Sequence, residues 1–189
     1  MEKKLRQQPK PNCIKVVFFG PESTGKSMLC ERLAAHYKTT YVPEFSRIYA
    51  EAQAQKHQPL SKADVLPIAI GQMALENEKL KKAKNLLICD TDLLETKVYS
   101  EYYYDGFCPP LVKKQALLNS YALYFLTYID TTWEADGIRD QPNNRKDLFD
   151  RFERELRTHH KTYVTLKGDF ETKLQTCITH VDELLKTQK

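Results

Sequence analysis

The sequence predicts an α/β fold in which a five-stranded parallel sheet carries helices on both faces. Short apolar runs alternate with longer helical stretches along the 189 residues, which is the pattern of parallel sheets. One run, at residues 85–90, is almost wholly apolar until it ends in Asp90, as expected of a strand buried on both faces. The length suits one domain, which we place at residues 13–189 after a flexible segment at residues 1–12.

A phosphate-binding motif, G-x-x-x-x-G-K-[ST], occupies residues 20–27, between an apolar run at residues 14–19 and a helical pattern. Its glycines allow successive backbone N–H groups to surround phosphate oxygens, and the helix that follows adds its positive N-terminal end. Lys26 is expected to reach the β- and γ-phosphates, and Ser27 to ligate Mg²⁺. We therefore predict ATP and Mg²⁺ as cofactors and a P-loop NTPase fold, a three-layer sandwich like that of nucleoside-monophosphate kinases. The predicted nucleotide-binding residues are Gly20, Pro21, Glu22, Ser23, Thr24, Gly25, Lys26, Ser27 and Met28, joined later in the chain by Arg145. The loop alone does not distinguish ATP from GTP.

The next predicted strand, residues 39–42, ends at Pro43 because proline lacks a backbone donor. Open α/β sheets bind ligands beyond the carboxyl ends of their strands, so we expect Glu44 and Arg47 to meet an acceptor substrate. A local ion pair at a helix start is the alternative. Helices are expected at residues 45–55 and 61–82, with a kink or a later start caused by Pro67.

Two carboxylates follow the buried strand, at Asp90 and Asp92. If the chain stays extended, both project from the same side at the strand tip and face the P-loop. We expect Asp90 to hold Mg²⁺ and Asp92 to bind or deprotonate an acceptor hydroxyl, although either of them or Glu44 could orient that hydroxyl. Capping of the helix that begins at Leu93 would explain Asp92 alone.

Helices are predicted at residues 93–104 and 108–118, and the tyrosines of the first are interpreted as packing because they wrap around it. After a strand at residues 121–129, the polar segment at about 131–145 resembles the lid of small P-loop kinases. Arg139 and Arg145 there would neutralise charge on the transferred group while closure excludes water. Trp133 belongs to this lid, although a tryptophan covering the core edge is the alternative. The chain should end with a helix at residues 145–160, a strand at 162–166 and a helix at 170–186.

Composition limits the function classes. The 29 Lys and Arg residues are interspersed with 25 Asp and Glu residues, so we do not expect nucleic acid as a partner. The five cysteines form no C-x-x-C pair, which is typical of reduced thiols in a cytosolic protein. Because no apolar run approaches the roughly 18 residues of a membrane span, we expect a soluble, cytoplasmic protein without membrane contact. The oligomeric state stays open.

Four segments occur in a characteristic order: the P-loop, Tyr-Val-Pro-Glu-Phe-Ser-Arg, Asp-Thr-Asp-Leu-Leu-Glu-Thr and Trp-Glu-Ala-Asp-Gly-Ile-Arg-Asp. With them the chain, from about Cys13 onward, resembles the ribosylnicotinamide kinase domain of the NadR family. The resemblance implies ATP-dependent phosphorylation of the 5′-hydroxyl of nicotinamide riboside, a small-molecule acceptor, to nicotinamide mononucleotide.

On the same resemblance, Asp90 and Asp92 would serve Mg²⁺ and the riboside, and Arg139 would act from the lid. The remaining residues are expected in the acceptor pocket, where one aromatic ring would stack on the pyridinium: Tyr41, Glu44, Phe45, Arg47, Trp133 and Asp136.

Two features depart from the family. Fused members carry an aromatic residue where this chain has Pro43, so which of Phe45, Tyr41 and Trp133 stacks on the pyridinium stays open. Better-known members also carry an adenylyltransferase domain, and some a DNA-binding helix-turn-helix, ahead of the kinase. Here about a dozen residues precede the first strand and none of the five histidines forms an H-x-G-H motif, so we expect neither adenylyl transfer nor repression from this chain. A kinase for another nucleoside, a nucleotide or a polynucleotide 5′ end is the alternative, and a P-loop ATPase or switch module is a third.

Overall fold

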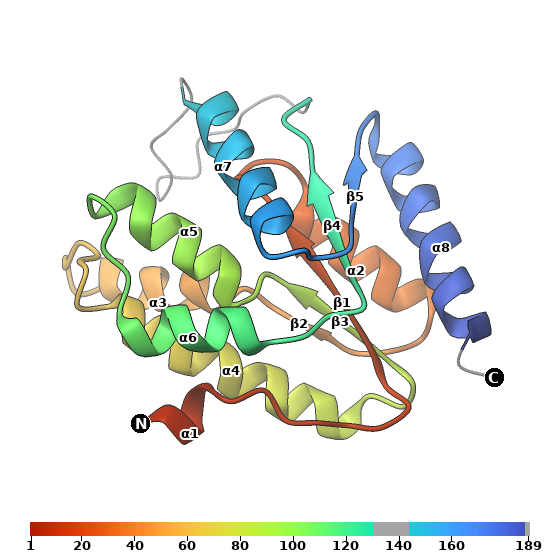
Figure 1. The fold of residues 1–189 in the computed structure, drawn as a ribbon, viewed down its shortest axis with the longest axis horizontal. Coiled ribbons are helices and arrows are strands. Elements are labelled where there is room, and N and C mark those ends of the chain that lie inside the picture. The colour runs from red at the N-terminus through yellow and green to blue at the C-terminus, as the bar shows by residue number, and fades with distance from the viewer. Residues whose placement is uncertain (131–143, 188–189) are drawn as a thin grey trace.

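The five strands form one sheet in the order β2-β3-β1-β4-β5, and every neighbouring pair is parallel (Figure 1). The strands are β1 (Ile14–Phe19), β2 (Tyr41–Val42), β3 (Leu86–Asp90), β4 (Leu123–Thr127) and β5 (Tyr163–Leu166). This computed structural model describes residues 1–130 and 144–187. The predicted five-stranded parallel sheet is confirmed, with the strand that leads into the P-loop at its centre.

Helices cover both faces of the sheet, as predicted (Figure 1). They are α1 (Glu2–Leu5), α2 (Lys26–His36), α3 (Phe45–Ala54), α4 (Val65–Lys82), α5 (Leu93–Tyr103), α6 (Pro110–Leu118), α7 (Arg145–Thr158) and α8 (Phe170–Thr187). Helix α4 begins at Val65 instead of near Ser61, so that Pro67 falls in the first turn, where backbone N–H groups have no partner within the helix. Among the described residues no helix combines the length and apolar character that crossing a bilayer requires.

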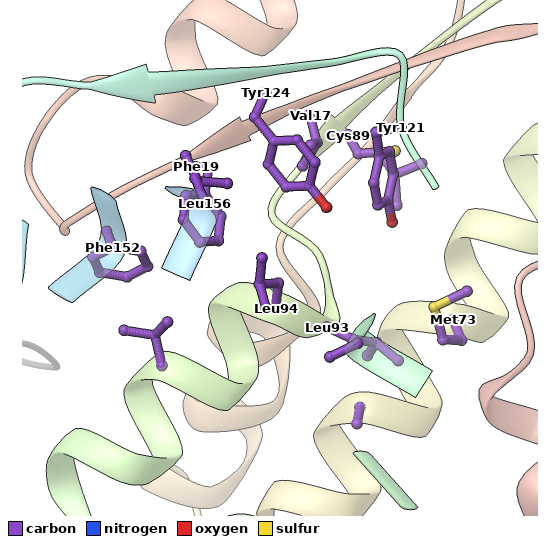
Figure 2. Packing of buried hydrophobic residues seen from close by; sticks show 14 of the residues in the cluster. Val17, Phe19, Met73, Cys89, Leu93, Leu94, Tyr121, Tyr124, Phe152 and Leu156 are labelled. Atoms are coloured by element: carbon purple, nitrogen blue, oxygen red, sulfur yellow. The ribbon is translucent and has the colours of Figure 1, made fainter. Parts of the chain in front are cut away.

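The core has two layers because alternate side chains of each strand point to opposite faces. Val16 and Phe18 of β1 pack with α2 and α8 on one face, and Val17 and Phe19 pack with α4 to α7 on the other. In the second layer the Phe19 and Phe152 rings meet edge to face, with centroids 4.8 Å apart. Figure 2 shows Phe19 and Tyr124 directed from the sheet toward α5 and α7. These contacts fix α5, which contributes most of one wall of the site described below.

The first twelve residues differ from expectation, since we predicted a flexible segment at residues 1–12. Leu5 of α1 is fully buried in the layer that contains α4 and α6. The Gln7 amide donates to the Glu76 carboxylate at 2.7 Å, and its oxygen accepts from the Ser120 N–H at 2.9 Å. The Lys10 ammonium donates to the Leu80 carbonyl at the end of α4, at 3.0 Å. Burial of one leucine and pairing of these polar groups hold a segment that its charged composition alone would leave free.

We expect Leu5→Ala to lower the free energy of unfolding by about 2 kcal/mol, because it removes a fully buried side chain from the core. Urea unfolding followed by circular dichroism measures the change. Leu118→Ala is the matched control, since Leu118 is 64% exposed and its truncation should cost less than about 0.5 kcal/mol. Equal losses in both variants would contradict the packing of the N-terminal segment.

Candidate functional site

The P-loop lies at the carboxyl edge of the sheet, pressed against the end of β4. Gly20 has a φ of 134°, and a Cβ placed on it would lie 2.8 Å from the Thr127 hydroxyl and 3.0 Å from the Thr127 carbonyl oxygen. No residue with a side chain fits there. The hydroxyls of Thr24 and Thr127 are 2.6 Å apart, which ties the middle of the loop to the same strand end. The loop is therefore held between β1 and β4.

Lys26 is buried, and its ammonium group has three polar partners. Its ammonium donates to the carbonyl oxygens of Gly20 at 2.6 Å and Pro21 at 2.9 Å, and it lies 3.3 Å from the Glu95 carboxylate. The other oxygen of Glu95 accepts from the Gly20 N–H at 3.2 Å. Burial raises the pKa of Glu95 to about 8, against the opposing effect of the Lys26 ammonium. The P-loop thus has a buried carboxylate partner supplied by α5.

Sequence reasoning missed Glu95. It stands three residues after Asp92, and this D-x-x-E spacing before an apolar helix is the signature of a capping box. In a capping box the glutamate folds back onto its own helix, whereas Glu95 contacts the P-loop instead. The spacing could have drawn attention to the residue, but its partner depends on how α5 packs on the sheet.

Asp92 departs from its predicted role in catalysis and acceptor binding. Thr91 has a φ of 85°, so the chain does not stay extended between Asp90 and Asp92, as that prediction required. The Asp92 carboxylate caps α5 by accepting from the Glu95 N–H at 2.9 Å, and it also accepts from the Tyr124 hydroxyl at 2.9 Å. It is fully buried and does not line the pocket described below. Capping, the alternative considered from the sequence, is the role that the structure gives it.

Asp90 remains beside the P-loop. It ends β3 in register with Phe18 of β1, and the next residue, Thr91, donates its N–H to the Phe18 carbonyl at 3.2 Å. Only 1% of Asp90 is exposed, whereas Ser27 in the first turn of α2 is exposed. Within the described ranges no three His, Cys, Asp or Glu side chains gather as a metal site. A divalent ion here would depend on phosphate and water oxygens as well as on protein ligands.

A pocket opens between α3, α4, α5 and the P-loop, and it is acidic. Among the described residues, Glu22 of the P-loop, Glu44 and Glu95 line it, together with one cation, Arg47. The Tyr99 hydroxyl donates to one oxygen of Glu22 at 2.7 Å. The other oxygen of Glu22 is buried and has no hydrogen-bond partner among the described residues. The pocket therefore offers carboxylate oxygens to a ligand directly beside the phosphate-binding loop.

One face of α5 forms the aromatic wall of this pocket. Glu95, Tyr99 and Tyr103 are spaced by four residues and all line the pocket, with the Tyr99 and Tyr103 rings stacked at a centroid distance of 6.0 Å. Our interpretation of these tyrosines as packing is confirmed for Tyr99, whose ring also meets the core residue Phe152 edge to face at a centroid distance of 5.2 Å. The expected wrapping around the helix does not hold for Tyr99 and Tyr103, because a spacing of four keeps both on one stripe. Tyr102 lies on another face of α5: it does not line the pocket, and the Arg151 guanidinium lies over its ring.

The two described aromatic residues that we predicted to stack on an acceptor lie elsewhere. The Tyr41 hydroxyl donates to Glu31 at 2.8 Å, and its ring packs in the layer that contains α2. The Phe45 ring rests against α4 at Gly71, where a Cβ would come within 2.0 Å of it. Neither residue lines the pocket. Strand alternation turns Tyr41 to the other face of the sheet, which its position near Glu44 in the sequence did not reveal.

The predicted lid is only partly described. Trp133, Asp136 and Arg139 lie outside the described residues. Arg145 begins α7, and its guanidinium donates to the Ser23 carbonyl of the P-loop at 3.3 Å. The end of this segment therefore contacts the nucleotide-binding loop.

Known proteins resemble the chain in sequence. A family model described as an AAA domain matches residues 15–173. The trifunctional NAD biosynthesis/regulator proteins NadR of Salmonella typhimurium and Escherichia coli are 29% and 28% identical to it over 92% of its length. The chain spans 43% of each of these relatives, so it corresponds to less than half of them.

Solved structures resemble it in fold. A NadR protein in complex with NR has a TM-score of 0.78 at 23% identity, covering 90% of this chain and 51% of that one. A NadR protein in complex with NAD and AMP-PNP has a TM-score of 0.74 at 20% identity, covering 92% and 50%. Thymidylate kinase from Ehrlichia chaffeensis has a TM-score of 0.63 at 16% identity, covering 91% and 100%. The predicted P-loop kinase fold and the resemblance to NadR are confirmed.

We expect Asp92→Ala to lower the free energy of unfolding by about 2 kcal/mol, because it removes a helix cap and leaves the Tyr124 hydroxyl without an acceptor. Asp92→Asn can cap the helix and should cost less. Denaturant titration measures the free energy of unfolding of both variants. The amount of nucleotide that folded Asp92→Asn binds at saturating nucleotide concentration should equal that of the original protein. Loss of nucleotide binding in a folded Asp92→Asn variant would contradict the structural role.

Burial raises the pKa of Asp92 to about 6 in the folded protein, from an ordinary value of 3.8. Between these two values the folded state holds the proton more tightly, so stability falls as the pH rises through that window. We therefore compare the free energy of unfolding of the original protein with that of Asp92→Asn. The original protein's value minus the variant's value should decrease between pH 4 and pH 6 and then level off. Urea titrations of both proteins across the range measure it, and a pH-independent difference would refute the shift.

Proposed function

We propose that the chain, which belongs to the AAA-domain family by a match over residues 15–173, transfers the γ-phosphoryl group of ATP to the 5′-hydroxyl of nicotinamide riboside. The observation that carries the proposal is the acidic pocket, which shares Glu22 with the P-loop. A hydroxyl bound there lies next to the phosphates that the loop would hold. Proximity of this kind is the main requirement of phosphoryl transfer.

The pocket's chemistry supports a cationic nucleoside as the acceptor. The pyridinium ring of nicotinamide riboside carries a positive charge, and in the described part of the pocket lining the carboxylates of Glu22, Glu44 and Glu95 outnumber the one cation, Arg47. The stacked rings of Tyr99 and Tyr103 suit a flat cationic ring. One buried oxygen of Glu22 has no hydrogen-bond partner in the part of the chain that the structure describes. It can accept a hydrogen bond from a ribose hydroxyl, which would offset the cost of its desolvation.

On the donor side, the backbone N–H groups of the P-loop and the N-terminus of α2 would hold the phosphates. Lys26 would leave the carbonyl oxygens of Gly20 and Pro21 and pair with the β- and γ-phosphates. Arg145, already in contact with the Ser23 carbonyl, is near enough to the loop to add a second cation. Charge on the transferred group would then be stabilised by two cations that already lie at the loop before the nucleotide binds.

Magnesium fits the residues beside the P-loop. The Ser27 hydroxyl and the Asp90 carboxylate supply only oxygen atoms, the donor type that Mg²⁺ prefers, and Asp90 is buried beside β1. When bound, Mg²⁺ would neutralise charge on the phosphates. The chain's own part is to present these two oxygens at the carboxyl edge of the sheet.

The relatives support the same reaction. The curated NadR proteins are described as NAD biosynthesis/regulator proteins, and the solved NadR structures hold NR in one case and NAD with AMP-PNP in the other. An ATP analogue and a riboside are the two kinds of ligand that this pocket and loop would take. For this chain, which covers less than half of the curated relatives, we propose the kinase step alone.

The direct test uses purified protein, Mg-ATP and a panel of nucleosides, with ADP release followed by a coupled assay and products identified by mass. Nicotinamide riboside should give the fastest release and a product heavier by one phosphate. If it releases no more ADP than buffer does while thymidine or deoxyadenosine is phosphorylated, the acceptor assignment is wrong and the pocket serves another nucleoside. ADP release that no acceptor changes would indicate an ATPase instead.

We expect Lys26→Ala to lower turnover by at least about 10²-fold, since it removes the cation that meets the transferred phosphate. The matched control is Lys82→Ala, a lysine of α4 whose side chain is 65% exposed, and its turnover should stay unchanged. Steady-state kinetics measure both, with circular dichroism to verify folding. Full turnover in a folded Lys26→Ala protein would remove the P-loop from the mechanism.

A further inference from the structure

Glu95 lies where the nucleotide loop and the acidic pocket meet. Its carboxylate contacts the Lys26 ammonium at 3.3 Å and the Gly20 N–H at 3.2 Å, and the same side chain lines the pocket. It is 1% exposed, so the attraction between its ionised form and the Lys26 ammonium is screened little by water. Glu95 therefore contacts the loop that would hold the ATP phosphates and also faces the pocket that would hold the acceptor.

The other two pocket carboxylates are held differently. Glu22 accepts from the Tyr99 hydroxyl, and Glu44 accepts from the Ser46 hydroxyl. Glu95 is held by Lys26, the cation that the phosphates of a nucleotide would themselves pair with, and by the N–H of Gly20 at the start of the same loop. Nucleotide binding therefore competes directly with Glu95 for Lys26.

We propose that Glu95 exchanges partners when ATP binds: Lys26 moves onto the phosphates, and the released carboxylate accepts the hydrogen of the acceptor's primary hydroxyl. This inference rests on the proposed function, because it requires a phosphoryl acceptor in the pocket. Glu95 then touches the reacting hydroxyl and is a catalytic residue that the sequence did not suggest.

The exchange follows from the cost of burying an unpaired charge. A carboxylate that is 1% exposed and loses its cation needs another donor, and a hydroxyl entering the pocket supplies one. A positively charged acceptor also restores the local charge balance. Binding of ATP should therefore increase the affinity for the acceptor, and by linkage the acceptor should increase the affinity for ATP.

The chemical step balances without a further reactant. The hydroxyl oxygen forms a bond to the γ-phosphorus as the bond between that phosphorus and the bridging oxygen of ADP breaks. ADP leaves with the electron pair of the broken bond. The hydroxyl proton passes to the Glu95 carboxylate and is released to water after the products leave.

The test compares Glu95→Gln and Glu95→Asp with Glu78→Gln, a control on the exposed side of α4. In Glu95→Gln, we expect kcat with the acceptor to fall by about 10²-fold, whereas KM for ATP changes by less than about 3-fold, because an amide cannot take the proton but leaves Lys26 available for phosphate. Glu95→Asp keeps a carboxylate and should recover part of kcat. Glu78→Gln should match the original protein.

A binding measurement separates a catalytic role from a purely structural one. Calorimetric titration of nicotinamide riboside, with and without a non-hydrolysable ATP analogue, should show at least about 5-fold tighter binding with the analogue in the original protein. In Glu95→Gln this ratio should approach one. The measurement on the original protein holds even if a variant fails to fold.

The outcomes distinguish this inference from the proposed function. An original protein that phosphorylates no member of the nucleoside panel overturns the proposed function and the role of Glu95 with it. An active original protein overturns only the Glu95 inference if Glu95→Gln keeps its kcat, if KM for ATP rises in parallel with the loss of kcat, or if the analogue leaves riboside affinity unchanged.

Discussion

Strand β1 pairs in parallel with β3 on one side and β4 on the other, and the site depends on this central position. Parallel pairing sends the ends of the three strands to one edge of the sheet, so Gly20, Asp90 and Thr127 meet there. The approach between Gly20 and Thr127 is too close for a side chain on the loop. A shift in this register would separate the P-loop from its acidic partners.

The site also requires charges that are expensive to bury. Lys26 and Glu95 are both almost completely buried, and each offsets part of the other's desolvation. Glu22 reaches the same region and is held by Tyr99. Such an arrangement adds little to stability, but it fixes donors and acceptors before a ligand arrives. Because a buried charge needs a partner, each side chain can change partners only when a ligand supplies a new one. Phosphate would replace Glu95 beside Lys26, and the acceptor hydroxyl would replace Lys26 beside Glu95.

Predictions from the sequence succeeded where the determinants are local. The P-loop needs only its own residues and the strand and helix around it, and the apolar run ending in Asp90 requires a strand buried on both faces. They failed where the answer depended on packing. Asp92 follows Asp90 by two residues, yet the backbone at Thr91 turns it into a helix cap bonded to Tyr124. Leu5 showed no pattern of its own and is nevertheless part of the core.

The sequence by itself determined the fold class, the nucleotide loop and the approximate position of most helices and strands, because hydrophobic periodicity and turn chemistry act over a few neighbouring residues. Only the tertiary structure decided which side chains face one another across the carboxyl edge of the sheet. It brings Glu95 to Lys26, turns one stripe of α5 toward the pocket, and directs Tyr41 to the opposite face. Those choices depend on how α5 packs against the sheet and on strand alternation, and contacts between residues distant in the chain fix them.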